Sequence, residues 1–223
     1  MTLMEDSGLG DFEPLERAAL HEQILVRLKT MIILGRFAPG QRLPLRSLAD
    51  SLGTSLMPVR DALQRLESVG VLRSNAARTM IVPILTRKER DDIANVRSIL
   101  ESETASQAAL HRSRDDLKFL EAQCEATQTA AERKSMELFL EANYSFHLRI
   151  AKCSLISFAS SILEPLWLLT GPVMKSEMPD QPYLERAVGL HYDVFRAIEA
   201  RDADAARLAM RNDVLARPTS PQA

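Results

Sequence analysis

The sequence is poor in glycine, aromatic residues and cysteine, and it has no long apolar run. Only 8 of its 223 residues are glycine and 5% are aromatic, a composition that favours helices over a sandwich or a barrel. Its apolar runs are short and its first residues are acidic, so we expect neither a transmembrane helix nor a secretory signal. The two cysteines, Cys124 and Cys153, lack zinc-site spacing, and we interpret both as buried apolar residues. These absences predict a cytoplasmic protein without a membrane partner.

The sequence also lacks the common nucleotide-binding and hydrolase motifs, and it has no overall excess of basic charge. It contains no glycine-rich phosphate loop, no metalloprotease helix and no nucleophile elbow. The net charge of −2 excludes a uniformly basic chain, yet residues 21–85 hold nine basic against four acidic side chains. The remainder, from residue 86, is slightly acidic. We therefore expect two domains with different partners, the first of them suited to nucleic acid.

The first third of the chain has the pattern of a helix-turn-helix. Residues 20–34 and 45–52 place apolar side chains at helical spacing, and Gly53 supplies the tight turn before a third helix. We expect the hydroxyl of Ser55 to cap that helix. Pro58 is tolerated in its first turn, where backbone N–H groups have no partner within the helix.

A short hairpin is expected to follow the third helix. Residues 71–73 and 79–84 have the pattern of two strands around a tip at 74–78. Three helices and a β-hairpin form a winged helix-turn-helix, which we assign to residues 17–85.

Two stretches of this domain resemble the GntR family of bacterial transcription regulators. They are ILGRFAPGQRLP from residue 33 and LADSLGTSLMPVRDALQRLESVGVL from residue 48. The resemblance implies a helix in the major groove of operator DNA, with arginines on guanine and on phosphates. The resemblance implies that the arginines of this region contact DNA, and three further residues lie at the start or on the outer side of the third helix. The predicted DNA-binding face therefore consists of Arg46, Ser55, Met57, Arg60, Gln64, Arg65 and Arg78. Without the motif, the same arginines would describe an ordinary solvated helix face.

The match departs from the family pattern at two places. Leu56 and Met57 stand where the family usually has Arg-Thr or Arg-Ser, so one base-reading guanidinium is missing. The wing tip has no glycine, although the family usually has glycine there. The departures predict an atypical operator sequence.

The rest of the chain predicts six helices and little else. Helical patterns cover residues 89–111, 114–129, 135–152, 155–174, 181–200 and 203–216. We predict a mainly α protein: an N-terminal winged helix-turn-helix and a C-terminal antiparallel helical bundle at residues 86–217. Residues 1–16 and 218–223 are then terminal tails.

Three segments of this bundle resemble the ligand-binding FCD domain of the FadR-like subfamily of GntR regulators. They are DIANVRSILES from residue 92, FHLRIA from residue 146, and HYDVFRAIEARDADAARLAMRND from residue 191. In that subfamily an Asp-x-x-x-His pair and two later histidines bind a metal ion beside a pocket for a small acid. The residues here at the implied metal positions are Asn143, His147, His191 and Asp213, and Arg97 is implied to reach the effector.

The altered ligand set leaves alternatives open. Asn143 and His147 share one helix face, and His191 and Asp213 are equidistant from Asp202, the expected start of the last helix. One imidazole fewer than usual shifts the site toward oxygen ligands, and we predict a divalent ion, zinc or nickel, that is bound more weakly. A metal-free polar pocket is the alternative, and Arg97 with Glu101 one turn later would also suit a simple intrahelical ion pair.

Together with these patterns, the resemblance implies a ligand-responsive transcription regulator, a repressor, that binds double-stranded operator DNA as a homodimer and senses a small organic acid. The alternatives are a metal-dependent enzyme in the bundle, in which the ion activates water, and a regulator whose effector site has degenerated. The absence of an evident nucleophile or base beside the candidate ligands argues against the enzyme.

Overall fold

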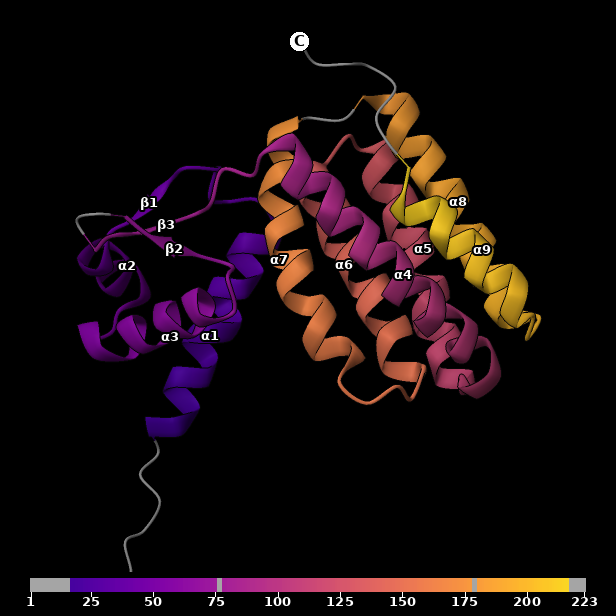
Figure 1. Ribbon diagram of the computed structural model, residues 1–223, viewed down its shortest axis with the longest axis horizontal. Helices are drawn as coiled ribbons and strands as arrows, with labels where there is room; N and C mark the ends of the chain where they lie inside the picture. Colours follow the sequence, from indigo (N-terminus) through magenta and orange to yellow (C-terminus); the bar gives the residue numbers. More distant parts are fainter. Residues whose placement is uncertain (1–16, 76–77, 178–179, 217–223) are drawn as a thin grey trace, which may run out of the picture.

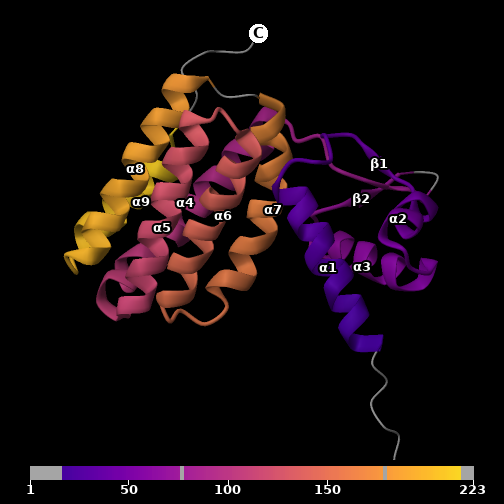
Figure 2. The ribbon, with the colours of Figure 1, turned by 180° about the vertical axis from the view of Figure 1, so that it is seen from behind.

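The computed structural model describes residues 17–75, 78–177 and 180–216, so both predicted terminal tails lie outside the described residues. A small winged helix-turn-helix stands beside a larger bundle of helices, and helix α7 lies between the rest of the bundle and the first domain (Figures 1 and 2). The predicted mainly α fold is confirmed. Within the described part of the chain, no helix is long and apolar enough to cross a membrane.

In the part of the first domain that the structure describes, there are three helices and a three-stranded sheet. Its elements in chain order are α1 (Arg17–Ile33), β1 (Arg42–Leu43), α2 (Leu45–Leu52), α3 (Leu56–Ser68), β2 (Arg73–Ser74) and β3 (Met80–Ile81). The antiparallel sheet has the order β1-β3-β2. Strand β1 was not predicted. Strands β2 and β3 are shorter than the expected strands at residues 71–73 and 79–84, and β2 begins two residues later than expected.

The turn between α2 and α3 forms as predicted, but the expected cap of α3 does not. Gly53 adopts φ +63, and its N–H donates to the carbonyl groups of Ala49 and Asp50. Ser55 is the N-cap of α3, but its side chain accepts no capping hydrogen bond. Pro58 occupies the third helical position and has no N–H, so the donor that a serine cap most often uses is missing. The predicted Ser55 cap is therefore wrong.

The tip of the wing replaces glycine with a strained arginine. Arg78 has φ +57, in the left-handed region, and its N–H donates to the carbonyl of Asn75 at 2.8 Å. The side chain of Asn75 accepts from the N–H of Thr79 at 2.9 Å. The turn closes without glycine because these bonds hold Arg78 in a conformation that side chains disfavour.

The described residues of the second domain form six helices: α4 (Arg87–His111), α5 (Arg114–Glu132), α6 (Met136–Cys153), α7 (Ala159–Glu177), α8 (Gln181–Glu199) and α9 (Ala203–Val214). Capping boxes begin two of them, with Thr86 and Glu89 before α4 and Ser113 and Asp116 before α5. Helix α4 packs along α9 and also contacts α6, α7 and α8, so it is central to the bundle.

The connection between α6 and α7 differs from the prediction. A helix was expected from residue 155, but Leu155 and Phe158 have φ +58 and +68 and α7 begins at Ala159. Both side chains are exposed. Their spacing is helical, but it reflects an apolar turn and not a buried helix face. The two cysteines are buried as predicted.

The two domains share one apolar core. Leu28 and Ile32 of α1 belong to the same cluster of buried residues as Leu163, Trp167 and Leu168 of α7. At the rim, Lys29 Nζ lies 2.8 Å from Glu164 Oε2. The hydroxyl of Tyr144 donates to the other oxygen of Glu164 at 3.2 Å, so helices α1, α6 and α7 meet at one carboxylate.

A glycine on α7 lies directly against the backbone of α1. A Cβ atom on Gly171 would lie 2.5 Å from the carbonyl oxygen of Ile33. Pro172 follows within the same helix. Gly171 therefore permits a contact between the domains that any larger residue would obstruct.

Candidate metal and effector site and DNA-binding face

Three predicted metal ligands come together in the bundle from three different helices. His147 on α6, His191 on α8 and Asp213 on α9 each offer one ligand atom, and these atoms lie within 4.8 Å of one another. His147 Nε2 is 3.0 Å from Asp213 Oδ2, and His191 Nε2 is 3.8 Å from Asp213 Oδ1. Both histidines are buried. The cluster depends on the packing of α6, α8 and α9, so single-helix spacing alone did not establish it.

A buried ion pair from α4 adjoins this cluster. Arg97 Nε donates to Glu101 Oε1 at 2.6 Å, and Glu101 Oε2 lies 2.6 Å from Nδ1 of His147 without the alignment of a hydrogen bond. The guanidinium of Arg97 also lies over the ring of Trp167, 3.6 Å from its centroid. Arg97 thus forms the predicted intrahelical ion pair, and this pair is buried inside the bundle. Through Trp167, Arg97 also contacts the interface between the two domains.

The environment gives the two histidines opposite charge states. Burial disfavours the charged form of His147, but the carboxylates of Glu101 and Asp213 outweigh burial and raise the pKa of His147 to about 9. Burial lowers the pKa of His191 to about 4. Burial would raise the pKa values of Glu101 and Asp213, but Arg97 and His147 lower the first, and the hydrogen bond and charge of His147 lower the second. The site therefore combines a histidinium, two carboxylates and one neutral imidazole.

Several buried polar atoms at this site have no hydrogen-bond partner among the residues that the structure describes. They include both ring nitrogens of His191 and the indole nitrogen of Trp167. A buried polar group without a partner costs free energy, and such groups mark sites that bind an ion, water or ligand. A neutral imidazole beside a carboxylate has the donor atoms that divalent metals use.

The predicted DNA-binding residues all lie on the surface of the first domain. Every one of the seven is exposed: Arg46, Ser55, Met57, Arg60, Gln64, Arg65 and Arg78. Of these, Arg65 lies 3.3 Å from Glu22 on α1, where both side chains are more than half exposed. Such surface pairs contribute little and are screened by salt, so Glu22 does not prevent a phosphate from binding Arg65.

The model of the FCD domain matches residues 92–216, and the model of the bacterial regulatory proteins of the gntR family matches residues 20–82. This chain belongs to the GntR family. The HTH-type transcriptional regulator McbR of Escherichia coli is 30% identical over 195 residues, which cover 86% of this chain and 88% of the relative. The repressor RspR of E. coli is 25% identical over 191 residues, 86% of this chain and 84% of the relative.

Solved structures agree with this assignment. The structure of E. coli McbR/YncC has a TM-score of 0.81 at 29% identity and covers 87% of this chain and 93% of the solved one. A GntR protein from Rhodococcus has a TM-score of 0.73 at 16% identity and shares the fold. Both matched families and these relatives are regulators, so the chain is a transcription regulator and the predicted enzyme alternative is wrong.

Glu101 is a further residue of the site, which the sequence indicated only as a partner of Arg97. Glu101 contacts both Arg97 and His147, and it connects the first helix of the bundle to the candidate metal site. A signal was present in the sequence: a polar stripe lies on the buried face of α4 and consists of Arg97, Ser98, Glu101 and Ser102. Asn143 is buried one turn before His147 and stays a predicted ligand.

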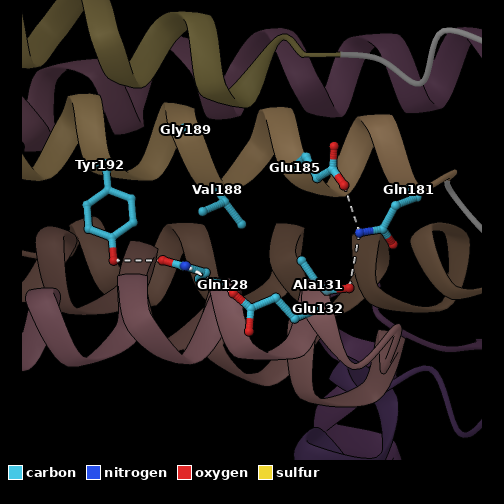
Figure 3. A pocket seen from close by; sticks show the side chains of 8 residues that line it. All are labelled: Gln128, Ala131, Glu132, Gln181, Glu185, Val188, Gly189 and Tyr192. Carbon is cyan, nitrogen blue, oxygen red and sulfur yellow. Dashed lines mark hydrogen bonds between the residues drawn. The ribbon is translucent and has the colours of Figure 1, made fainter.

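A separate hollow on the regulator's surface, of about 470 Å³, lies between α5 and α8 (Figure 3). Its polar side chains bond one another: Tyr192 donates to Gln128, Gln128 to Glu132, and Gln181 to Glu185. No orphaned buried atom lines it among the described residues. We assign it no ligand.

Proposed function

We propose that this regulator is a repressor that binds operator DNA through residues 17–85 as a homodimer. Its bundle, residues 86–217, senses a small organic acid through a bound divalent metal. The observation that carries the sensing proposal is the buried cluster of His147, His191 and Asp213 with two unpartnered nitrogens on His191. The repressor assignment rests on the similarity to RspR, which is described as a repressor.

The residues present fit a metal ion. His147, His191 and Asp213 would hold it, Asn143 is the fourth candidate, and the ion would supply a positive centre for a carboxylate. Glu101 lies against Nδ1 of His147, where it favours a proton on Nδ1 and leaves Nε2 for the ion, as a carboxylate behind a ligating histidine does. Binding of the ion requires His147 to lose its second proton, so affinity is expected to fall in acid.

Arg97 is the proposed partner of the acid's carboxylate. It is already bound by Glu101 and lies on Trp167. An incoming acid therefore shares or competes for a guanidinium that contacts α7, the helix on which the DNA-binding domain packs. Ligand binding would act on DNA affinity by favouring one arrangement of the two domains over the other.

Metal analysis tests the sensing proposal. Protein purified without chelator or histidine tag is expected to contain close to one equivalent of zinc or nickel, and EDTA should lower its melting temperature. His147→Ala and His191→Ala should lose the metal, whereas His111→Ala, an exposed histidine at the end of α4, should keep it. Thermal shift against a panel of small organic acids then identifies the effector class.

A metal-free polar pocket is the second candidate, favoured by the 3.0 Å contact between His147 and Asp213, which already pair without an ion. No stoichiometric metal and no effect of EDTA would support that pocket. A further absence of any thermal shift by acids would indicate a degenerate effector site.

A further inference from the structure

Two large apolar side chains stand uncovered at the start of α3. Met57 is 57% exposed and Leu56 is 37% exposed. The buried face of the same helix is complete without them, because Val59, Ala62 and Leu66 pack into the core of the first domain. Exposed apolar side chains framed by polar residues mark contact surfaces.

The surroundings of these two residues identify the kind of partner. Met57 and the exposed Arg60 and Gln64 follow one another at helical spacing on the outer side of α3, and Arg46 is exposed on the neighbouring α2. Basic residues beside these side chains can bind DNA phosphates, and arginine and glutamine can form hydrogen bonds with base edges. The N-terminal residues of a recognition helix are those that reach the bases. An apolar side chain in that position meets one apolar group in the major groove, the 5-methyl group of thymine.

We propose that Met57, supported by Leu56, reads thymine 5-methyl groups in the operator. The inference rests on the proposed DNA-binding face and specifies what that face recognises. Leu56 stands where the family usually has an arginine, so apolar side chains take the place of a base-reading guanidinium at the start of α3. Arg60 and Gln64 keep the hydrogen-bonding part of the recognition.

The test replaces thymine by uracil, which removes the methyl group and leaves every hydrogen-bonding group in place. A duplex is first selected from a random library by the full-length wild-type protein. Each thymine of one half-site is then replaced singly by uracil, and dissociation constants are measured for wild type, Met57→Ala and Val69→Ala. Val69 is the matched control, an exposed apolar residue at the other end of α3.

At one or two thymines, uracil is expected to weaken the binding of wild type about fourfold, the equivalent of one buried methyl group. Val69→Ala should show the same loss. Met57→Ala should bind the thymine duplex more weakly and show no further loss with uracil. The inference is overturned if no replacement weakens wild type, or if Met57→Ala keeps the full uracil penalty.

A failure of the DNA-binding proposal would look different. In that case the wild-type protein would enrich no duplex from the library, and the inference would fall with the proposal on which it rests. Enrichment of a duplex whose affinity ignores uracil would overturn the methyl contact alone.

Discussion

Glu101 connects the candidate metal site to Arg97 on the first helix of the bundle. Its carboxylate lies between Arg97 and His147, and it is 1% exposed. A buried carboxylate needs charged or hydrogen-bonding neighbours to offset the cost of its burial. The position therefore controls the protonation of His147 and the orientation of Arg97 together.

Replacing this carboxylate should lower the pKa of His147. In Glu101→Gln the shape is kept and the charge is lost, so the pKa of His147 should fall clearly below its value of about 9. NMR titration of the His147 ring in metal-free protein measures this directly. The variant should also unfold at lower urea concentration, because Arg97 is left buried without its partner, a change that typically costs about 3–5 kcal/mol.

The same contact makes stability depend on pH. A raised pKa means that protonated His147 contributes stability fully below its ordinary pKa of 6.5, and that this contribution is lost as pH rises past about 9. Metal-free wild type should lose stability over that window and Glu101→Gln should lose less. Equal slopes for the two proteins would contradict the assigned role of Glu101.

Arg78 combines backbone strain with a predicted role in DNA binding. Its φ of +57 is one that glycine adopts without cost. Arg78→Gly should therefore raise the free energy of unfolding by up to about 1 kcal/mol, in line with the cost of left-handed backbone. The same change should weaken DNA binding by removing a cation from the wing. A variant that is both less stable and equally tight on DNA would contradict both halves of this prediction.

At the scale of elements, the contact between α1 and α7 carries the connection between domains. Gly171→Ala would place a Cβ 2.5 Å from the carbonyl oxygen of Ile33, against backbone that cannot move aside cheaply. We expect a loss of about 1–3 kcal/mol, as for other overpacked sites. Urea unfolding followed by the fluorescence of Trp167, the sole tryptophan, measures it.

Gly189→Ala is the matched control for that variant. Nothing lies within 4 Å of a Cβ on Gly189, which is also within a helix. Alanine should be neutral or stabilising there, by about 0.5–1 kcal/mol. Equal changes in the free energy of unfolding for the two variants would show that the domain contact does not determine the effect at Gly171.

The sequence predicted most of the elements, because local signals determine them. Helical spacing and polar caps located the helices of the bundle to within a few residues. The sequence-based prediction was wrong at two helix starts. Pro58 lacks the N–H that the Ser55 side chain would cap, and the left-handed backbone at Leu155 prevents α7 from beginning there. The convergence of His147, His191 and Asp213 came from resemblance, since no single helix contains it. Glu101 was missed as a site residue because its contact with His147 depends on how α4 packs on α6.

For the whole molecule, one winged helix presents too small a surface for a tight and specific site. We expect two copies on a near-palindromic operator with two recognition helices one turn of DNA apart. Sedimentation at micromolar concentration should show a dimer, and DNA binding should weaken steeply with salt. A monomer with and without DNA would contradict this assembly.

The central claim is that the buried site in the bundle controls the affinity of the winged helix for DNA. His147 precedes Leu148, which belongs to the core shared with α1, so fixing His147 with a metal should steady the contact between domains. The most direct measurement is the dissociation constant for the selected duplex, taken with zinc-loaded and EDTA-treated protein at equal ionic strength. We predict at least about fivefold tighter binding by the zinc-loaded wild type, the lower end of usual coupling between sites, and no such difference in His191→Ala. Equal dissociation constants for the two forms of wild type, with one zinc per chain confirmed in the loaded form, would contradict the account.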